Sequence, residues 1–315
     1  WVKVELDLGD GKKTYYRDTN TMPNWAGSCW YYMRYIDPTD TKHMVEKDEF
    51  DYWMGPNHNK YSGDEGGVDL YIGGVEHAVL HLLYSRFWHK FLYDIGVVPT
   101  REPYQKRTSH GMILGENGEK MSKSRGNVVN PNDVVAQYGA DTMRLYIMFI
   151  GDFEKAAPWN TSSIKGCKRF LDRIWAMGDK LVEGGVRPEL ESLMHRTIKK
   201  VGEDIDSLKA NTAIAQLMIY VNALSDAGGA TRPEYEVLLQ LLNPFAPHMT
   251  EELWEQMGHE DRLAYHPWPK YDEAKCTEQT IEIAVQVNGK IKARIKVPAG
   301  VEAADAIAAA KAEPA

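Results

Sequence analysis

Three cations, two hydroxyls and a glycine stand together at Lys120-Met121-Ser122-Lys123-Ser124-Arg125-Gly126, here called the lysine loop. Transfer of a nucleotidyl group from ATP builds negative charge on the departing pyrophosphate, and ammonium groups on a mobile loop can stabilise that charge. Lys120 and Lys123 are therefore candidate catalytic residues. The alternative is a solvated surface loop, because basic runs usually lie on solvated faces.

A second candidate site surrounds a glycine turn. The pattern predicts a short buried strand over 69–72, a tight turn at Gly73-Gly74 and a helix over 75–95 that Gly96 ends. On this helix His77 and His81 are four residues apart and face one way. The same stripe holds Tyr84 and Trp88, while the opposite side, expected to face the core, holds Val79, Leu82, Leu83 and Phe87.

Three interpretations of the two histidines remain open. They can chelate zinc, although no third ligand is evident and Glu76 precedes His77 instead of following it. They can be hydrogen-bonded core residues. They can also bind a substrate, since a glycine turn lets a nucleotide approach the backbone and Glu76 can accept a hydrogen bond from a ribose hydroxyl.

Aromatic residues are dense over residues 20–32, around the small-residue turn Ala26-Gly27-Ser28. One interpretation is the start of a core helix. The other is the wall of a pocket for an apolar amino acid, because one methylene changes binding by only about 1–3 kcal/mol and close shape must supply the selectivity.

The elements that position these residues begin with a β-hairpin over 2–17 that turns at Asp10-Gly11. A strand over 109–114 and a turn over 116–119 lead into the lysine loop. Asn130 is expected to cap a helix that starts at Pro131 and ends at Gly139, and Asp141 to cap the next helix through Ile150.

The second half of the chain carries mostly helical periodicity. After a linker over 151–160, helices are expected from Ile164 to Gly258, with breaks at 184–185, 228–229 and 243–244. Alternation over 280–297 predicts a hairpin with a type I′ turn at Asn288-Gly289, and a helix begins near Ala303. The fold class is α/β, followed by an all-α bundle and the start of a small α/β domain.

Composition limits the function classes. With 315 residues, 43% hydrophobic and 26% charged, the chain is typical of globular proteins with more than one domain, and it has no apolar run long enough for a membrane span. Its three cysteines lack CxxC spacing, which predicts neither a zinc knuckle nor disulfides and fits a reducing cytoplasm. The net charge is −8, so nucleic acid would have to bind at local basic patches.

The lysine loop resembles the mobile KMSKS loop of class I aminoacyl-tRNA synthetases. Gly111-Met112-Ile113-Leu114 precedes it, and Gly126-Asn127 and the helix start at 138–144 follow, which is the expected strand-loop-helix setting. The resemblance implies that Lys120, Ser122 and Lys123 bind the triphosphate of ATP and that the backbone of Met112 and Ile113 meets adenine. It implies ATP with Mg²⁺ as a substrate complex, and no structural metal in the chain.

The stretch from Tyr71 to Lys90 resembles leucyl-tRNA synthetases in particular, which activate leucine with ATP and join it to tRNA(Leu). By this resemblance, Gly73, Gly74 and Glu76 match ATP-contacting positions. The implied leucine pocket consists of Trp25, Ser28, Tyr31, Tyr71, His77 and His81. Two residues depart from the family, since Trp25 stands where Phe is common and Cys29 where a serine is usual.

The helical half resembles the anticodon-binding bundle of the same family through residues 168–175 and 243–254. Lys165, Lys168, Arg169 and Arg173 are candidates for tRNA phosphates, with a solvated helix face as the alternative. The hairpin over 280–297 resembles the beginning of the family's carboxy-terminal tRNA-contacting domain. Its basic residues are Lys290, Lys292, Arg294 and Lys296.

The predicted organisation has four parts: residues 1–20 as the exit hairpin from a missing editing domain, 21–150 as the second half of the catalytic domain, 151–275 as the bundle, and 276–315 as a truncated carboxy-terminal domain. The family's HIGH motif has no match, since His110-Gly111 lies in the strand that leads to the lysine loop. We therefore expect the missing amino-terminal half as a partner and an isolated chain that is weakly active or inactive. No signal peptide is expected behind Trp1.

Two other functions remain open. The chain can be a tRNA-binding piece without chemistry, which would bind tRNA with a steep salt dependence and neither ATP nor leucine. It can also be a zinc hydrolase that uses His77 and His81.

Overall fold

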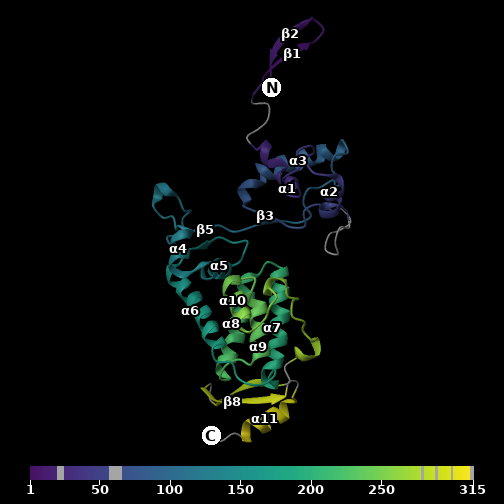
Figure 1. The fold of residues 1–315 in the computed structure, drawn as a ribbon. Coiled ribbons are helices and arrows are strands. Elements are labelled where there is room, and N and C mark those ends of the chain that lie inside the picture. Colours follow the sequence, from purple (N-terminus) through teal and green to yellow (C-terminus); the bar gives the residue numbers. More distant parts are fainter. Residues whose placement is uncertain (20–24, 57–65, 278–279, 288–289, 299–300, 313–315) are drawn as a thin grey trace. The chain divides into compact units, whose positions relative to one another are not determined.

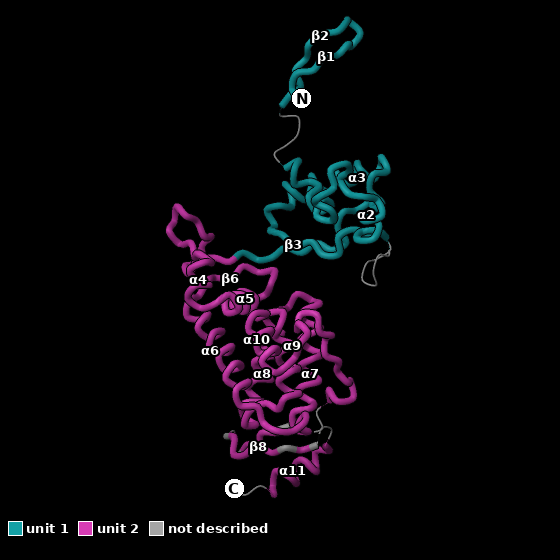
Figure 2. Tube along the Cα trace, viewed as in Figure 1, with its two compact units in different colours: residues 1–112 teal, residues 113–315 magenta. Residues whose placement is uncertain are grey.

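The structure is a computed structural model that describes residues 1–19, 25–56, 66–277, 280–287, 290–298 and 301–312. Contacts between Cα atoms divide the chain into two compact units, residues 1–112 and 113–315 (Figures 1 and 2). The division falls within the segment 21–150 that was expected to form one domain. Each sheet formed by described residues has two strands, and the fold is mixed α/β.

The first element is the predicted hairpin. Strands β1 (Lys3–Asp7) and β2 (Lys12–Tyr16) are antiparallel, with Lys3 opposite Tyr16. Asp7 Oδ1 accepts hydrogen bonds from the backbone N–H groups of Gly9 and Gly11 at 2.9 and 3.1 Å, which closes the turn. Both glycines have positive φ, the conformation that glycine adopts without steric cost.

The rest of the first unit is built from short helices around a small core. The elements are η1 (Ala26–Cys29), α1 (Tyr31–Arg34), α2 (Lys47–Met54), β3 (Tyr71–Gly73), η2 (Val75–Ala78), α3 (His81–Asp94) and β4 (Arg107–Ser109). Strands β3 and β4 are parallel. The core consists of Tyr32, Met33, Phe50, Met54, Leu92 and Val98.

The predicted helix over 75–95 is wrong at its start. A 3-10 turn, η2, ends at Ala78, Leu80 has non-helical backbone angles, and the α-helix begins at His81. His77 and His81 therefore do not share one helix. The predicted inner face was also wrong: Val79, Leu83 and Phe87 are exposed and Leu82 is half-buried.

The buried stripe of α3 is His81, Ser85, His89 and Leu92, so three of its four residues are polar. Hydrogen bonds make this possible, since a buried polar group costs little when it has a partner. Tyr104 Oη donates to Ser85 Oγ at 2.7 Å, and His89 lies 2.8 Å from Tyr32 Oη and 2.9 Å from Thr100. A helical wheel that ranks residues by hydrophobicity therefore assigns the buried face of α3 to the wrong side of the helix.

The strand predicted over 109–114 is interrupted. Strand β4 ends at Ser109 and pairs with β3, whereas β5 (Ile113–Leu114) pairs with β6 (Ala157–Pro158) inside the predicted linker. The turn over 116–119 is confirmed: Gly115 and Glu119 are hydrogen-bonded across it, and Gly118 has φ of 75°. The lysine loop follows, with the 3-10 turn η3 (Lys123–Arg125).

Helix α4 (Pro131–Tyr138) has the predicted ends, since Asn130 Oδ1 accepts from Asn132 N at 3.1 Å and Gly139 ends the helix. Helix α5 (Ala140–Phe149) does not have its predicted cap. Asp141 lies inside the first turn, and its carboxylate accepts from Met249 N at 2.7 Å and His248 Nδ1 at 2.7 Å. Asp141 therefore caps α10 (Pro247–Gln256), more than one hundred residues along the chain.

The bundle is as predicted, with one further break. Figure 1 shows α6 (Thr161–Gly178), α7 (Pro188–Asp206), α8 (Ala210–Asp226), α9 (Arg232–Leu242) and α10 packed together. They share a large core with α4 and α5. The unpredicted break falls at Leu208, which adopts a left-handed φ of 57°. Glu234 is fully buried and paired with Arg187 at 2.7 Å.

The last elements are the 3-10 turns η4 (Leu263–Tyr265) and η5 (Glu273–Lys275), strands β7 (Thr280–Val287) and β8 (Lys290–Pro298), and α11 (Ala303–Ala312). The hairpin and the final helix are confirmed. The predicted type I′ turn at 288–289 lies outside the described residues. Among the helices described, none is long and apolar enough to cross a membrane.

Candidate functional site

One cavity in the first unit collects the residues predicted for the leucine pocket. It has a volume of about 390 Å³, here called the Tyr71 cavity. Its lining comprises Trp25, Ser28, Tyr31, Tyr71, Ile72, Gly73, Gly74, His77, His81, Leu82 and His110. All six predicted pocket residues and both predicted glycines are in this set. The volume lies within the range of small-ligand sites.

The Tyr71 hydroxyl is the centre of the polar wall. It is hydrogen-bonded to Tyr31 Oη and lies 2.6 Å from His81 Nε2. Burial lowers the pKa of His81, and the neighbouring His77 lowers it further. A neutral His81 that accepts from Tyr71 at Nε2 carries its proton on Nδ1. Burial raises the pKa of Tyr71, which therefore keeps its proton.

Two buried ring nitrogens have no hydrogen-bond partner among the described residues, His77 Nδ1 and His81 Nδ1. The His77 ring meets the edge of Trp25, with 5.7 Å between centroids, and lies 6.4 Å from the His81 ring. Buried polar atoms without partners are rare, and a catalytic role, a bound ion or an ordered water can account for them. The residues described here give the two histidines no third metal ligand.

The glycine turn leaves its backbone open on one side. A Cβ atom on Gly73 would meet nothing within 4 Å, whereas a Cβ on Gly74 would collide with the Glu76 carboxylate at 2.4 Å. Glu76 therefore folds back over the turn. On the other side, Arg107 Nη2 donates to the Gly74 carbonyl at 3.1 Å and fixes the turn to β4.

A second layer of aromatic residues supports the cavity. The Tyr104 ring stacks on Tyr71 with 4.1 Å between centroids, and burial raises the pKa of Tyr104 to about 12. Tyr104 was not predicted, because it belongs to no strand or helix pattern in the sequence. The lining residues Ile72 and His110 were not predicted either, and Leu82 was expected in the core. Their only signal is proximity in sequence to the glycine turn and to Gly111.

The lysine loop belongs to the second unit and is shaped by Asn127. Asn127 Oδ1 accepts from Ser122 N at 2.9 Å, and its Nδ2 donates to the Lys120 carbonyl at 3.3 Å. Met121 is half-buried against the bundle core, and Gly126 takes a left-handed φ of 65°. Lys120 and Lys123 are exposed and form no ion pair with any residue that the structure describes, so their charges are available.

Met112 and Ile113, the predicted adenine positions, fall on either side of the division between the units. Met112 is exposed, while Ile113 is half-buried in β5 against the bundle core. Ser122 Oγ is hydrogen-bonded to Ser124 Oγ at 2.8 Å. Of the predicted ATP residues, two line the Tyr71 cavity (Gly73 and Gly74) and three lie in the lysine loop (Lys120, Ser122 and Lys123). The other three, Glu76, Met112 and Ile113, belong to neither.

The predicted tRNA-binding residues lie on α6. Lys165, Arg169 and Arg173 recur every four residues on its exposed side, and Lys168 is paired with Asp172. Arg169 and Arg173 also line a surface pocket of about 420 Å³. In the terminal hairpin Lys292 and Arg294 are exposed, and the side chains of Lys290 and Lys296 lie outside the described set.

Two families of known proteins match parts of the chain. Residues 80–160 match the family described as "tRNA synthetases class I (I, L, M and V)", and residues 188–307 match "Anticodon-binding domain of tRNA ligase". The chain belongs to the class I aminoacyl-tRNA synthetases.

Within that class, leucine–tRNA ligases are among the relatives of the chain. The enzyme from Bifidobacterium longum (strain DJO10A) is 50% identical over 97% of the chain, and that from Alkaliphilus oremlandii is 54% identical over 94%. A solved structure is also similar, that of the agnB2 LeuRS of Agrobacterium radiobacter K84 in a ternary complex with tRNA and LeuAMS. The match covers 100% of the present chain and 42% of the LeuRS chain, with a TM-score of 0.76 and 30% sequence identity. The chain spans about a third of the length of the curated relatives.

Proposed function

We propose that the chain carries part of the active site and tRNA-binding surface of a leucine–tRNA ligase. The observation that supports this most is the Tyr71 cavity, which is lined by all six residues that the sequence resemblance implies for a leucine pocket. In the proposed reaction, a leucine carboxylate oxygen attacks the α-phosphorus of ATP and the bond to pyrophosphate breaks. The 2′-hydroxyl at the end of tRNA(Leu) then takes the leucyl group and releases AMP.

The cavity suits leucine because its walls differ in polarity. Trp25, Ile72 and Leu82 supply apolar surface, while Tyr71 and His81 supply hydrogen-bonding atoms. A neutral His81 avoids repulsion of the leucine ammonium group. The Gly73 backbone is open to a nucleotide, and Glu76 is the proposed partner of its ribose.

Lys120 and Lys123 are proposed to bind the phosphates, because both are exposed on the lysine loop. The loop is held by the hydrogen bond of Asn127 and by the packing of Met121 against the bundle core. Mg²⁺ would arrive with ATP, as it usually does at phosphate-transfer sites. Catalysis then rests on positioning and charge stabilisation, without a protein nucleophile. Three further predictions remain part of this proposal. They are a cytoplasmic location, an amino-terminal half of the enzyme as a partner, and tRNA binding by Lys168, Arg169 and Arg173.

Binding of a leucyl-adenylate analogue, measured by calorimetry, tests the cavity. We expect binding that His81→Ala weakens at least tenfold and that His195→Ala, a change in the bundle, leaves unaltered. Equal affinity in wild type and His81→Ala would contradict the proposal. Binding of tRNA alone, with a steep salt dependence and no analogue binding, would support the non-catalytic alternative.

Leucine-dependent exchange of pyrophosphate into ATP tests the activity of the isolated chain. Because the chain spans about a third of its relatives, we propose that its exchange rate is far below that of a full-length relative. A rate equal to the full-length enzyme would refute this part of the proposal. The zinc hydrolase alternative predicts metal at His77 and His81, and elemental analysis with no change in zinc content in His77→Ala would exclude it.

A further inference from the structure

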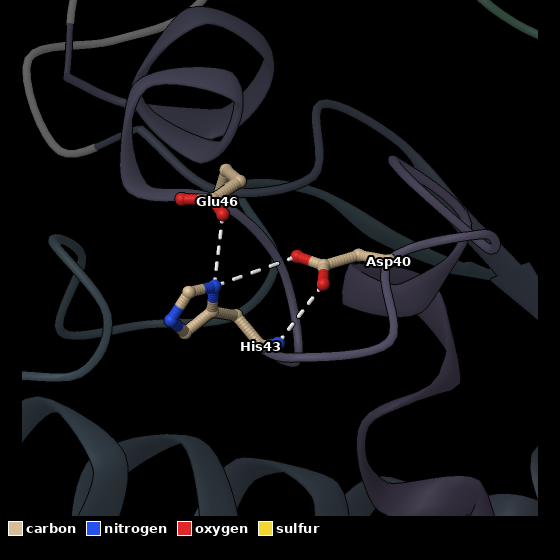
Figure 3. A group of neighbouring side chains, drawn as sticks. All are labelled: Asp40, His43 and Glu46. Carbon is tan, nitrogen blue, oxygen red and sulfur yellow. Dashed lines mark hydrogen bonds and ion pairs between the residues drawn. The ribbon is translucent and has the colours of Figure 1, made fainter.

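A cluster of three possible metal ligands lies in the first unit, outside the Tyr71 cavity. Asp40, His43 and Glu46 belong to the segment between α1 and α2, and one ligand atom from each lies within 4.8 Å of the other two. Figure 3 shows the Nδ1 atom of His43 directed toward both carboxylates. His43 Nδ1 is 2.8 Å from Glu46 Oε1 and 3.7 Å from Asp40 Oδ2.

The Asp40 carboxylate has one buried oxygen without a hydrogen-bond partner among the described residues. Its side chain is only 8% exposed, and its Oδ2 atom has no hydrogen-bond partner among the described residues. Its other oxygen, Oδ1, accepts from the backbone N–H groups of Lys42 and His43 at 2.7 and 3.0 Å. A buried carboxylate oxygen therefore faces His43 without a hydrogen-bond donor among the described residues.

The backbone of this segment is held in place. Arg34 donates to the carbonyls of Asp40, His43 and Met44, the last two at 2.9 and 3.2 Å. The three carbonyls are thereby turned onto Arg34, while the side chains of Asp40 and His43 face each other (Figure 3). The ligand positions are fixed before any ion binds, which reduces the entropic cost of binding.

The spacing and chemistry of the three ligands agree with one kind of ion. Ligand atoms that share a tetrahedral zinc at about 2.0–2.1 Å lie about 3.4 Å apart, and the two distances from His43 Nδ1 bracket this value. An imidazole suits Zn²⁺ and its transition-metal neighbours, whereas Mg²⁺ and Ca²⁺ prefer oxygen ligands alone. We propose that Asp40 Oδ2, His43 Nδ1 and Glu46 Oε1 bind a divalent transition metal of the zinc type, with water in the fourth position.

Such an ion would act on the fold beside the cavity. Glu46 immediately precedes α2, and α2 contributes Phe50 and Met54 to the small core of the first unit. Tyr31, whose hydroxyl reaches Tyr71, packs against that core. A metal bound by the native state alone stabilises it by mass action. The ion would therefore hold the start of α2 and stabilise the unit that contains the cavity, independently of whether leucine binds there.

A metal-free explanation makes a different prediction. A protonated His43 can bridge the two carboxylates as an ion pair, and the cluster then needs no ion. In that case zinc would bind no better than at other surface histidines. His266 provides the matched control, because its Nδ1 lies 2.8 Å from Asp261 Oδ2 and it has one carboxylate partner where His43 has two.

The test titrates the metal-free chain with ZnCl₂ against a chromophoric zinc chelator. We expect one tight site per chain, at least tenfold weaker in His43→Ala and in Glu46→Gln and unchanged in His266→Ala. MgCl₂ should not compete. Zinc should also raise the melting temperature of the wild type but not of His43→Ala.

Three results would overturn the proposal: no binding, adventitious binding only, with several weak sites, or an equal loss in His43→Ala and His266→Ala. His43 and Glu46 are largely exposed, so both substitutions leave the core intact. Circular dichroism of each variant would confirm that the chain is folded. None of these readouts depends on aminoacylation, so failure here would leave the proposed function untouched.

Discussion

The Tyr71 hydroxyl is shared between Tyr31 and His81, so its removal isolates the polar wall of the cavity. In Tyr71→Phe the ring can still stack on Tyr104, and the fold should persist. The substitution removes both hydrogen bonds. The bond to His81 orders the polar wall and is worth about 1 kcal/mol, so analogue affinity should fall roughly fivefold. Calorimetry measures this, with the exposed Tyr52→Phe as the control. Unchanged affinity would show that the hydroxyl does not order the site.

His89 predicts a pH dependence of stability. Burial lowers its pKa to about 4, from about 6.5 in the unfolded chain. The folded state therefore favours neutral His89, and its contribution is complete above pH 6.5 and is lost as the pH falls toward 4. The loss is on the order of 3 kcal/mol.

Amide hydrogen exchange in α3 measures this effect locally. Protection of residues 81–94 should fall between pH 6.5 and 4 in the wild type, after correction for the intrinsic exchange rate. His89→Gln should be less stable at neutral pH and should show a flatter profile. Parallel profiles in the two proteins would contradict the assignment to His89.

At the scale of elements, Asp141 links α5 to α10. Its carboxylate satisfies backbone N–H groups at the start of α10 and is mostly buried. Loss of such a cap costs about 1–2 kcal/mol, so Asp141→Ala should lower the free energy of unfolding by this amount and deprotect the first turn of α10. Asp141→Asn keeps an acceptor and should cost less. Asp133→Ala, in the exposed first turn of α4, is the control.

Elements with strong local signals were predicted and the others were not. The ends of α4 follow from Asn130-Pro131 and Gly139, which fix backbone geometry by themselves. The helix breaks at Leu208 and at Leu80 both fall on leucine residues. Neither break is marked in the sequence by the glycine or proline that usually signals a helix end. The polar inner face of α3 depends on partners from distant segments, and no helical period reveals them.

The candidate site shows the same limit. Trp25, Ser28 and Tyr31 come from one segment and Tyr71, His77 and His81 from another, and each segment had a recognisable local pattern. Their meeting in one cavity is tertiary, as is the support from Tyr104. The cluster of Asp40, His43 and Glu46 was not predicted, although its i, i+3, i+6 spacing is visible in the sequence.

At the scale of the whole molecule, the two units differ in the size of their cores. Among the residues that the structure describes, the buried cluster of the first unit has six members, whereas that of the second unit spans seven helices. Hydrophobic stabilisation grows with buried apolar area, so the first unit should unfold at lower urea concentration than the second. Hydrogen exchange across a urea series measures both. A single transition shared by α3 and α8 would contradict this expectation.

The contact between Asp141 and α10 also has a consequence in time. Met249 follows Asp141 by 108 positions, and closing a chain segment of that length costs about 4 kcal/mol of entropy beyond a constant. A ribosome adds about 5–20 residues per second, so Met249 is synthesised roughly 5 to 20 s after Asp141. The bond should therefore form after the folding barrier. Asp141→Ala would then speed unfolding by roughly 5- to 30-fold and leave the refolding rate nearly unchanged.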